Sequence, residues 1–301
     1  MVRYWVCAIV AVAMSGCANF KAVSAFATET EKLTATIDSE FKQLDTLCEK
    51  QATLSIVIND NNDQPLEDCK TLKAARGRFA LVTVEVLGRY AKTLTALADN
   101  KSLDMSSDID GLAKKVKNLK GPDGSGFVDD KQLDALNKVA QVLVDVVTAA
   151  RREAAVRRLT AETANLKASS DILRRFFGGA ATSPAIRAQS PYGNWIGLVT
   201  STAQSNASSL GSPAFAGKEP LRTAELRREV KAVQTLLAQR QAAGEDSVPA
   251  KIVNAIGAWQ TALQTFEKDA LVADAPDMLL KLNDLRDKAA AARDAVEGLS
   301  K

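Results

Sequence analysis

The sequence predicts an all-α fold, an elongated antiparallel helical bundle with several long helices. Hydrophobic residues make up 46 % of the 301 residues but aromatic residues only 5 %, and long stretches consist mainly of residues that favour helices. Apolar residues recur at three- and four-residue spacing along most of the chain, which is typical of helices with one buried face. Because the links between these stretches are short, neighbouring helices are expected to pack antiparallel.

The first 17 residues are predicted to be a signal peptide, outside the bundle. Arg3 supplies a positive charge, and residues 5–14 form an uncharged apolar segment, which has signal-peptide length and is too short to span a bilayer. Two small residues then precede Cys17. The sequence Met14-Ser15-Gly16-Cys17 resembles the lipobox of bacterial lipoproteins. The alternatives are an ordinary secretory signal that contains a cysteine by chance, or a buried helix.

The resemblance implies a location and identifies no activity. In lipoproteins the signal is removed, and the cysteine, here Cys17, becomes the first residue and carries acyl chains such as palmitate. Each buried methylene contributes about 0.8 kcal/mol, so several acyl chains hold a protein on a membrane. Ala18 follows the cysteine, and in such lipoproteins a residue other than Asp there favours the outer membrane, with the body in the periplasm.

The first helix of the body is predicted over 26–51, with an apolar face of Phe26, Leu33, Ile37, Phe41, Leu44 and Cys48. Residues 53–64 interrupt this period, because a β-branched run is followed by a turn-forming run of Asn and Asp. Asp63 is expected to cap a second helix, which has Pro65 in its first turn and continues to about Asp99.

Cys48 and Cys69 lie at the end of the first of these helices and near the start of the second. In an oxidising compartment such a pair favours a disulfide over a metal site or a nucleophile, since neither residue has a neighbouring cysteine and the chain contains no histidine. A bridge that closes about twenty residues contributes on the order of 3 kcal/mol. We interpret the pair as structural.

The rest of the N-terminal region, 18–177, is predicted to hold a short helix over 106–119 and one long helix over about 129–177. A continuous helix of that length would extend ~70 Å, which is why we expect an elongated molecule. Its apolar face shifts in phase near 151–158, which indicates a kink or a change of packing partner.

The turn at 121–130 resembles the middle of an EF-hand loop, which binds calcium. If Gly126 takes the place of the loop's glycine, however, Gln132 occupies the last position, where calcium needs a bidentate carboxylate. A turn that caps the next helix explains the same residues, because Asp129 and Asp130 are favourable at a helix N-terminus. We assign no metal and no other cofactor.

Residues 178–218 are predicted to form a connection rich in Gly, Ala, Ser and Pro, in which 192–198 is a short helix or an anchored turn. The C-terminal region, 219–301, is predicted to hold three helices that start near Thr223, Ser247 and Pro276 and pack on the same bundle. Nothing in the length of the chain requires a second domain.

Two sets of residues are candidates for binding a partner. Aromatic residues in a long connection are typical interface anchors, although they can instead hold that connection on the bundle. Basic clusters on the long helix can bind an acidic protein, anionic head groups or lipopolysaccharide phosphates, or they can form a solvated face with i,i+4 partners such as Glu153. On an unbroken helix Arg157 and Arg175 face the same way, five turns apart. The candidates are Tyr192, Trp195, Phe215, Arg151, Arg157, Arg158 and Arg175.

Charge and composition argue against two functional classes. The chain contains 39 basic and 36 acidic residues, whereas a dedicated nucleic-acid binder needs an excess of positive charge. Without histidine there is no Ser-His-Asp triad and no imidazole base, and neither a Walker loop nor a dinucleotide-binding turn is present. We therefore predict no enzymatic activity.

The sequence as a whole predicts a non-enzymatic lipoprotein of the cell envelope that binds a protein partner, in an assembly or secretion apparatus or to neutralise a toxin. An alternative is a lipoprotein that binds lipid or a small ligand, which needs an apolar cavity between helices, whereas docking needs a filled core and an exposed patch. A third is an enzyme that uses carboxylates, which would need acids clustered in a cleft with raised pKa values.

Overall fold

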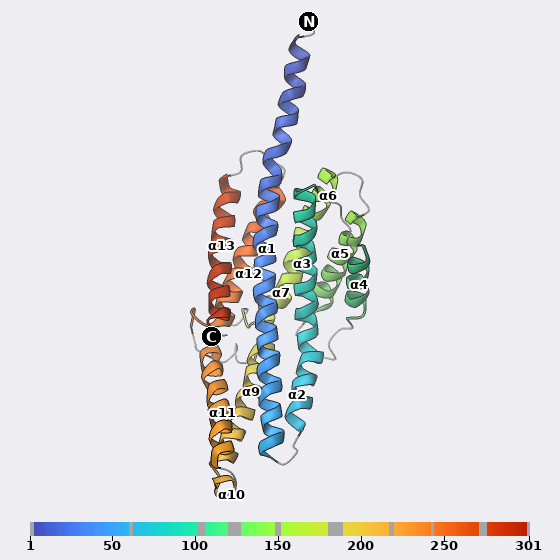
Figure 1. Cartoon of the computed structure of the whole chain (residues 1–301). Helices are drawn as coiled ribbons and strands as arrows, with labels where there is room; N and C mark the ends of the chain where they lie inside the picture. Colours follow the sequence, from blue (N-terminus) through green and yellow to red (C-terminus); the bar gives the residue numbers. More distant parts are fainter. Residues whose placement is uncertain are drawn as a thin grey trace. The chain divides into compact units, whose positions relative to one another are not determined.

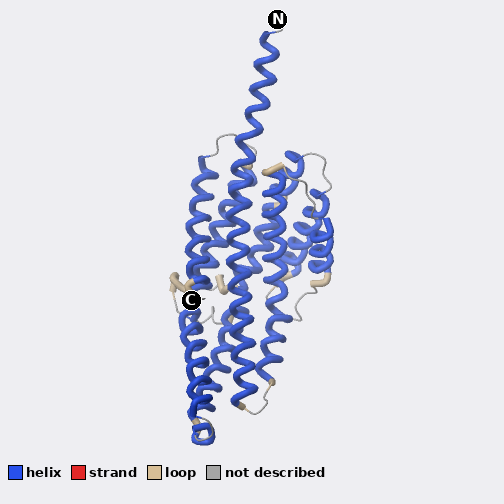
Figure 2. The backbone as a smooth tube through the Cα atoms, in the orientation of Figure 1, coloured by secondary structure: helices blue, strands red, loops and turns tan. Residues whose placement is uncertain are grey.

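The computed structural model describes residues 3–59, 63–100, 106–119, 128–147, 152–179, 189–216, 220–241, 244–270 and 276–299, and its account of side chains starts at Phe20. Within these ranges every regular element is a helix and none is a strand (Figure 1, Figure 2). The prediction of an all-α helical bundle is therefore confirmed.

The helices follow one another as α1 (Arg3–Ile58), α2 (Gln64–Leu72), the π-helix η1 (Lys73–Gly77), α3 (Arg78–Ala98), α4 (Ser106–Lys117), α5 (Asp130–Val147), α6 (Arg152–Thr160), α7 (Thr163–Phe176), α9 (Pro191–Gly211), α10 (Pro213–Ala216), α11 (Pro220–Gln241), α12 (Val248–Asp269) and α13 (Pro276–Glu297). The three helices expected in the C-terminal region correspond to α11, α12 and α13. Within the described ranges, no helix contains an apolar stretch long enough to cross a membrane.

The chain divides into two compact units, and each combines segments that are far apart in the sequence. Unit 1 contains Met1–Thr36, Val82–Leu173 and Asn254–Ala291. Unit 2 contains Ile37–Leu81, Arg174–Val253 and Ala292–Lys301. The regions expected from the sequence are continuous stretches of the chain. Each of the two units instead combines early and late parts of the chain.

The core of unit 1 includes an aromatic contact between α1 and α12. The ring of Phe26 stacks on that of Phe266, with centroids 4.6 Å apart, and on that of Trp259 at 6.1 Å. The Trp259 Nε1 donates to the Thr30 hydroxyl at 2.9 Å, so its one polar atom is satisfied. Aromatic pairs of this kind contribute about 0.5–1.5 kcal/mol beyond their burial, and the contact therefore holds the two helices in register.

Arg152 closes the C-terminal end of α3 in unit 1. Its guanidinium donates to the carbonyl oxygens of Leu97 and Ala98 and its Cζ lies 3.8 Å from the centre of the Phe20 ring. Carbonyls in the last turn of a helix lack intrahelical partners, so a cation there satisfies them and interacts favourably with the helix dipole. Arg152, which follows the candidate Arg151 in the sequence, therefore has a structural role.

The stretch expected as one long helix over 129–177 is divided among α5, α6 and α7, which corrects the sequence prediction. Between α6 and α7 the Glu162 N–H donates to the carbonyl of Leu159, three residues earlier, at 3.3 Å. The Thr163 hydroxyl donates to the Thr160 carbonyl at 2.8 Å. Such local bonds from a hydroxyl compete with the helical ladder, and here they accompany the end of α6.

The connection expected over 178–218 contains the 21-residue helix α9, which is a second correction. Its Gly and Ser residues favour loops, yet α9 packs against α11 and buries one face. The Ser190 Oγ accepts from the Gly193 N–H at 3.0 Å, and Pro191 stands at the first helical position, both of which favour a helix start. Tertiary burial therefore outweighs weak propensity along this helix.

The first helix of the body also extends beyond its predicted end, since α1 continues to Ile58. Leu54 and Ile58 are buried and pack in unit 2 with Leu210 of α9 and Val230 of α11. The β-branched run was expected to end the helix because such residues lose side-chain freedom in a helix. Burial of Leu54 and Ile58 offsets that preference, although Val57 stays 42 % exposed.

Two helix starts show how well helix caps were predicted from the sequence. At α5 the Gln132 N–H donates to Asp129 Oδ1 at 2.9 Å, and the Asp129 N–H donates to Gln132 Oε1 at 3.2 Å. This reciprocal pair is a capping box, so the interpretation of Asp129 as a helix cap is confirmed. Asp63 precedes α2 as predicted, but its side chain makes no capping hydrogen bond. Its carbonyl oxygen accepts the first helical N–H groups instead.

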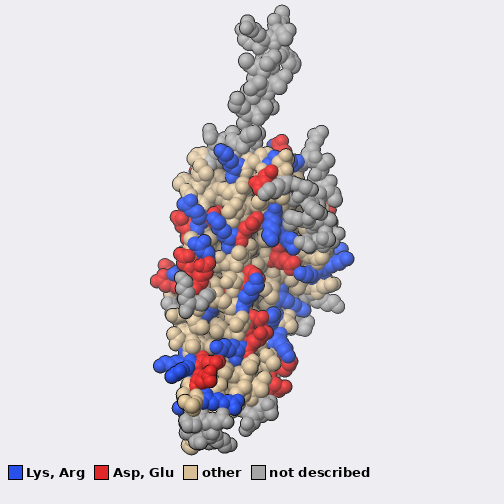
Figure 3. All heavy atoms as spheres, viewed as in Figure 1, with Lys and Arg blue, Asp and Glu red and all other residues tan. Residues whose placement is uncertain are grey.

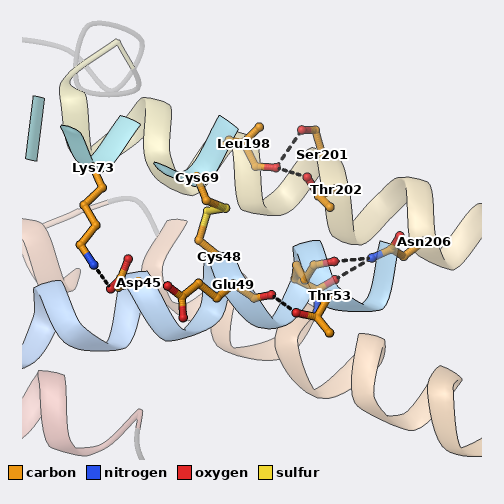
Figure 4. Close-up of a disulfide and its surroundings, with 11 residues drawn as sticks. Asp45, Cys48, Glu49, Thr53, Cys69, Lys73, Leu198, Ser201, Thr202 and Asn206 are labelled. Atoms are coloured by element: carbon orange, nitrogen blue, oxygen red, sulfur yellow. Dashed lines mark hydrogen bonds and ion pairs between the residues drawn. A yellow bond between two sulfur atoms is a disulfide. The ribbon is translucent and has the colours of Figure 1, made fainter. Parts of the chain in front are cut away.

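The disulfide between Cys48 of α1 and Cys69 of α2 is present in unit 2, with the two Cα atoms 5.9 Å apart (Figure 4). Both cysteines are buried. Close by, Lys73 of η1 forms an ion pair with Asp45 of α1. The expected bridge between the end of the first helix and the start of the second is therefore confirmed.

We predict that the double variant Cys48→Ser/Cys69→Ser has a free energy of unfolding about 3 kcal/mol lower than the wild type, because the unfolded chain is no longer cross-linked. Urea unfolding under non-reducing conditions measures this difference. A reductant should reproduce the loss in the wild type and leave the double variant unchanged. Equal stability of the two proteins would show that the bridge does not stabilise the fold.

Candidate functional site

A buried ion pair connects α1 and α11 inside unit 2. The Nε of Arg240 donates to Glu40 Oε1 at 2.9 Å, and its Nη2 donates to Oε2 at 3.2 Å. The side chains of Arg240 and Glu40 are 1 % and 0 % exposed. Taking two charges out of water is expensive, and such a pair is favourable only where further hydrogen bonds satisfy the remaining polar atoms.

Tyr192 and Gln43 supply those further hydrogen bonds. The Tyr192 hydroxyl donates to Glu40 Oε1 at 2.9 Å, and Arg240 Nη2 donates to Gln43 Oε1 at 2.6 Å. The Nε2 of Gln43 in turn donates to the carbonyl of Val296 at 3.3 Å. One polar atom of the ion pair remains unsatisfied. Arg240 Nη1 is buried and has no hydrogen-bond partner among the described residues.

An aromatic cluster covers one side of this network. The Tyr192 ring lies 5.2 Å from that of Phe177 and 6.4 Å from that of Phe176, and Phe41 contacts both phenylalanines. These apolar rings exclude water and lower the local dielectric, which strengthens every hydrogen bond that is made and raises the cost of one that is missing.

Burial dominates the protonation equilibria of the network. It raises the pKa of Glu40 above its ordinary value of 4.5, while the positive charge of Arg240 and then the hydrogen bonds from Arg240 and Tyr192 act in the opposite direction. Burial also raises the pKa of Tyr192 well above 10.0, and the neighbouring Glu40 adds to that shift. The phenol therefore keeps its proton and donates a hydrogen bond to the carboxyl group.

A groove of about 460 Å³ lies beside the network, within unit 2. Its lining includes three leucines as well as polar side chains, and Arg240 forms part of it although this residue is only 2 % exposed. The lining residues are Ser39, Lys42, Gln43, Thr46, Leu47, Leu236, Arg240 and Leu299. The volume falls within the range of small-molecule sites, roughly 300–1,000 Å³.

The aromatic residues named as candidate docking anchors are mostly internal. Tyr192 and Trp195 are 3 % and 2 % exposed and lie on the buried face of α9. Phe215 is partly buried and packs against the cluster formed by Leu54 and its neighbours. This placement favours the alternative interpretation, in which these rings hold their segment in the bundle.

The arginines named as candidates are brought together only in part. Arg157 and Arg158 lie on α6 in unit 1, whereas Arg175 is an exposed residue of α7 that belongs to unit 2. Because α6 and α7 are separate helices, Arg157 and Arg175 do not lie on one face of an unbroken helix. Arg157 pairs with Glu153 at 2.8 Å, the i,i+4 contact that the alternative interpretation named.

Two of the named positions lie outside what the structure describes. Arg151 is not among the described residues, and Cys17 precedes the first described side chain. The interpretation of Cys17 as a lipidation site stays a prediction. So does any role of Arg151 in binding.

Glu40 and Arg240 are not among the residues predicted from the sequence, although the sequence contains a signal for both. Glu40 stands three residues after Ile37 on the predicted apolar face, and Arg240 stands three residues after Leu237 on the corresponding face of α11. A charged residue at a core-facing position needs a partner, because an unpaired buried charge is very costly. Two such residues of opposite sign could have been proposed as a pair.

Comparisons with protein families, with curated proteins and with solved structures find no match to this chain. In the part of the chain that the structure describes, no group of three or more Cys, Asp or Glu residues is placed to hold a metal ion. On the face seen in Figure 3, basic and acidic side chains are interspersed. The buried pair and its groove are therefore the most distinctive chemistry of the described residues.

We predict that Tyr192→Phe lowers the free energy of unfolding by about 1–3 kcal/mol at pH 7, because Glu40 loses a buried hydrogen-bond donor. The loss should be smaller near pH 4. The hydrogen bond from the Tyr192 hydroxyl stabilises the ionised form of Glu40 and so lowers its pKa in the folded state. Without this hydrogen bond that pKa rises further, and only the ionised form of Glu40 becomes less stable. The unfolded state is the same in both proteins, so the difference between variant and wild type grows as the pH rises through the folded-state pKa of Glu40, which burial places above 4.5.

Urea unfolding between pH 4 and pH 8 tests this dependence, with Tyr90→Phe as the matched control. The Tyr90 hydroxyl is buried but has no hydrogen-bond partner among the described residues, so its removal should cost nothing at any pH. A Tyr192→Phe penalty that does not change with pH would contradict the proposed coupling.

Proposed function

We propose that this protein is a lipoprotein of the cell envelope, held on a membrane through acyl chains on Cys17, whose helical body acts by binding and not by catalysis. The sequence Met14-Ser15-Gly16-Cys17, which follows an uncharged apolar segment, is the observation that carries this proposal. The Ala18 that follows favours the outer membrane, with the body in the periplasm. A disulfide between Cys48 and Cys69 suits an oxidising compartment of this kind.

The first candidate function is contact with an envelope protein, in an assembly or secretion apparatus or in neutralising a toxin. Support comes from Arg157 and Arg158 of α6, whose side chains are 65 % and 51 % exposed. Their partners, Glu153 and Asp145, are also at the surface. Surface ion pairs contribute only about 0–1 kcal/mol, so acidic groups of a partner can replace them at little cost.

The second candidate function is binding of a lipid or another small ligand. The specific observation in its favour is the groove of about 460 Å³, which combines Leu47, Leu236 and Leu299 with a buried guanidinium. Ligand sites typically pair an apolar lining with a few fixed polar groups. The two candidates involve different units, since α6 belongs to unit 1 and the groove to unit 2.

The enzymatic alternative receives less support from the described site. A carboxylate mechanism needs a second acid near the first, whereas the partners of Glu40 are Arg240, Tyr192 and, through Arg240, Gln43. Both carboxylate oxygens of Glu40 are already occupied. Glu40 is therefore better suited to a structural role than to proton transfer.

We predict that the wild-type protein incorporates a palmitate analogue in bacterial cells and sediments with membranes, and that Cys17→Ser does neither, because its side chain cannot form the thioether. Click detection on gels and membrane fractionation measure the two properties. Cys7→Ser, in the segment that is removed, is the matched control and should behave as the wild type does. Absence of label on the wild type, or identical fractionation of Cys17→Ser, would overturn the lipoprotein proposal.

Binding through α6 predicts that the double variant Arg157→Glu/Arg158→Glu loses proteins that the wild type captures by cross-linking in membranes, since reversed charge repels an acidic partner. Quantitative mass spectrometry of the captured proteins measures the loss, which should be at least about tenfold for a specific partner. The double variant Lys114→Glu/Lys117→Glu reverses two exposed charges on α4 of the same unit and should leave capture unchanged. Equal loss in both variants would indicate a general charge effect and contradict a specific α6 surface.

A further inference from the structure

We propose that the groove beside the Glu40–Arg240 pair binds a small amphiphile with an apolar chain and a carboxylate end, and that Arg240 and Lys42 receive the carboxylate. This inference rests on the second candidate function and specifies its ligand. Two independent observations carry it, namely the groove itself and the unpartnered donor of Arg240.

The polar end of the proposed site is the guanidinium of Arg240. Its Nε and Nη2 are used by Glu40 and Gln43, whereas Nη1 is buried without a hydrogen-bond partner among the described residues. A buried donor that is left unpaired costs about 1–3 kcal/mol, and more when it is charged. A ligand that brings an acceptor to Nη1 recovers this cost, which an apolar molecule cannot do.

Access to Nη1 requires a movement of one side chain. The atom has almost no exposed surface, although Arg240 is one of the residues that line the groove. Gln43 is the lining residue in place to move, because its Oε1 contacts the neighbouring Nη2 at 2.6 Å and its side chain is only partly buried. A carboxylate that takes the place of the Gln43 amide can accept from both Nη1 and Nη2, in the two-point geometry that a planar guanidinium favours.

The charges around the groove favour an anion over a cation. Lys42, at the rim, is 75 % exposed and pairs at 2.6 Å with Asp38, which is itself 40 % exposed. Such a surface pair exchanges partners readily. The carboxylate of Glu40 is turned to Arg240 and Tyr192 and has no free oxygen for a cationic ligand. A cation would therefore meet Arg240 and Lys42 without compensation.

The apolar end of the site is formed by Leu47 of α1, Leu236 of α11 and Leu299 near the C-terminus. Leucines from three separate segments line an open groove with room for a short alkyl chain, and burial of each methylene contributes about 0.8 kcal/mol. Ser39 and Thr46 also line the groove. The ligand that fits both ends is a carboxylate with a chain of moderate length.

The test is isothermal titration of the full-length chain carrying Cys17→Ser, which has no acyl chains of its own to compete for the groove, with decanoate below its micelle concentration. Decanol, decylammonium and decyl phosphate are titrated in parallel. We expect decanoate to bind with one site per chain and about tenfold more tightly than decanol, a difference of about 1.4 kcal/mol. Decylammonium should not bind, and decyl phosphate should bind more weakly than decanoate.

Two pairs of variants locate the binding without disturbing the buried ion pair. Leu236→Trp fills the groove and should weaken decanoate binding by about tenfold or more, whereas Leu221→Trp, at an 88 % exposed position of the same helix, should have no effect. Lys42→Glu should weaken binding severalfold, and Lys50→Glu, two turns further along α1 and outside the groove, should not. Thermal unfolding confirms that each variant is folded.

Each possible result has one meaning. If no amphiphile binds, the ligand-binding function itself is wrong. If decanol binds as tightly as decanoate and Leu236→Trp blocks both, the groove binds ligands but the carboxylate inference is overturned. If decyl phosphate binds more tightly than decanoate, the head group is a phosphate and the inference is again overturned. If Leu236→Trp leaves decanoate binding unchanged, the groove is not the site.

Discussion

The contact between Glu40 and Arg240 is the constraint on which the arrangement of unit 2 depends. Two charges that are both removed from water must meet each other, and Tyr192 must reach the same carboxylate. These requirements fix the positions of α1, α9 and α11 relative to one another, because a shift of one residue along any of them would leave a buried charge unpaired. Apolar contacts alone tolerate such shifts more easily, since they are not directional.

A second set of polar contacts reinforces the pairing of α1 with α9. The Asn206 Nδ2 donates to the carbonyl of Gln51 at 3.1 Å, and Ser209 donates to Asn59 Oδ1 at 2.7 Å. Together with the disulfide of Cys48, these contacts fasten the end of α1 to its neighbours in unit 2.

Local sequence signals predicted the helices well where the periodicity was strong and the caps were well defined. The apolar faces through Phe26, Trp259 and Phe266 are buried as expected, and Asp129 caps α5. The errors lie where propensity and burial disagree. The Gly- and Ser-rich α9 and the β-branched end of α1 favour loops or strands when considered alone, and both are helical because their apolar side chains pack in unit 2.

The sequence by itself determined the all-α class, the pairing of Cys48 with Cys69, the absence of any imidazole chemistry and the lipobox-like segment that ends at Cys17. These follow from composition, from the spacing of residues and from the small number of cysteines, all of which are local or countable. Only the tertiary structure decided that Tyr192 and Trp195 are internal and that Glu40 meets Arg240, two hundred residues away. The reason is physical: burial and long-range charge pairing depend on which helices become neighbours, and a one-dimensional pattern shows which face of a helix is apolar but not what that face will contact.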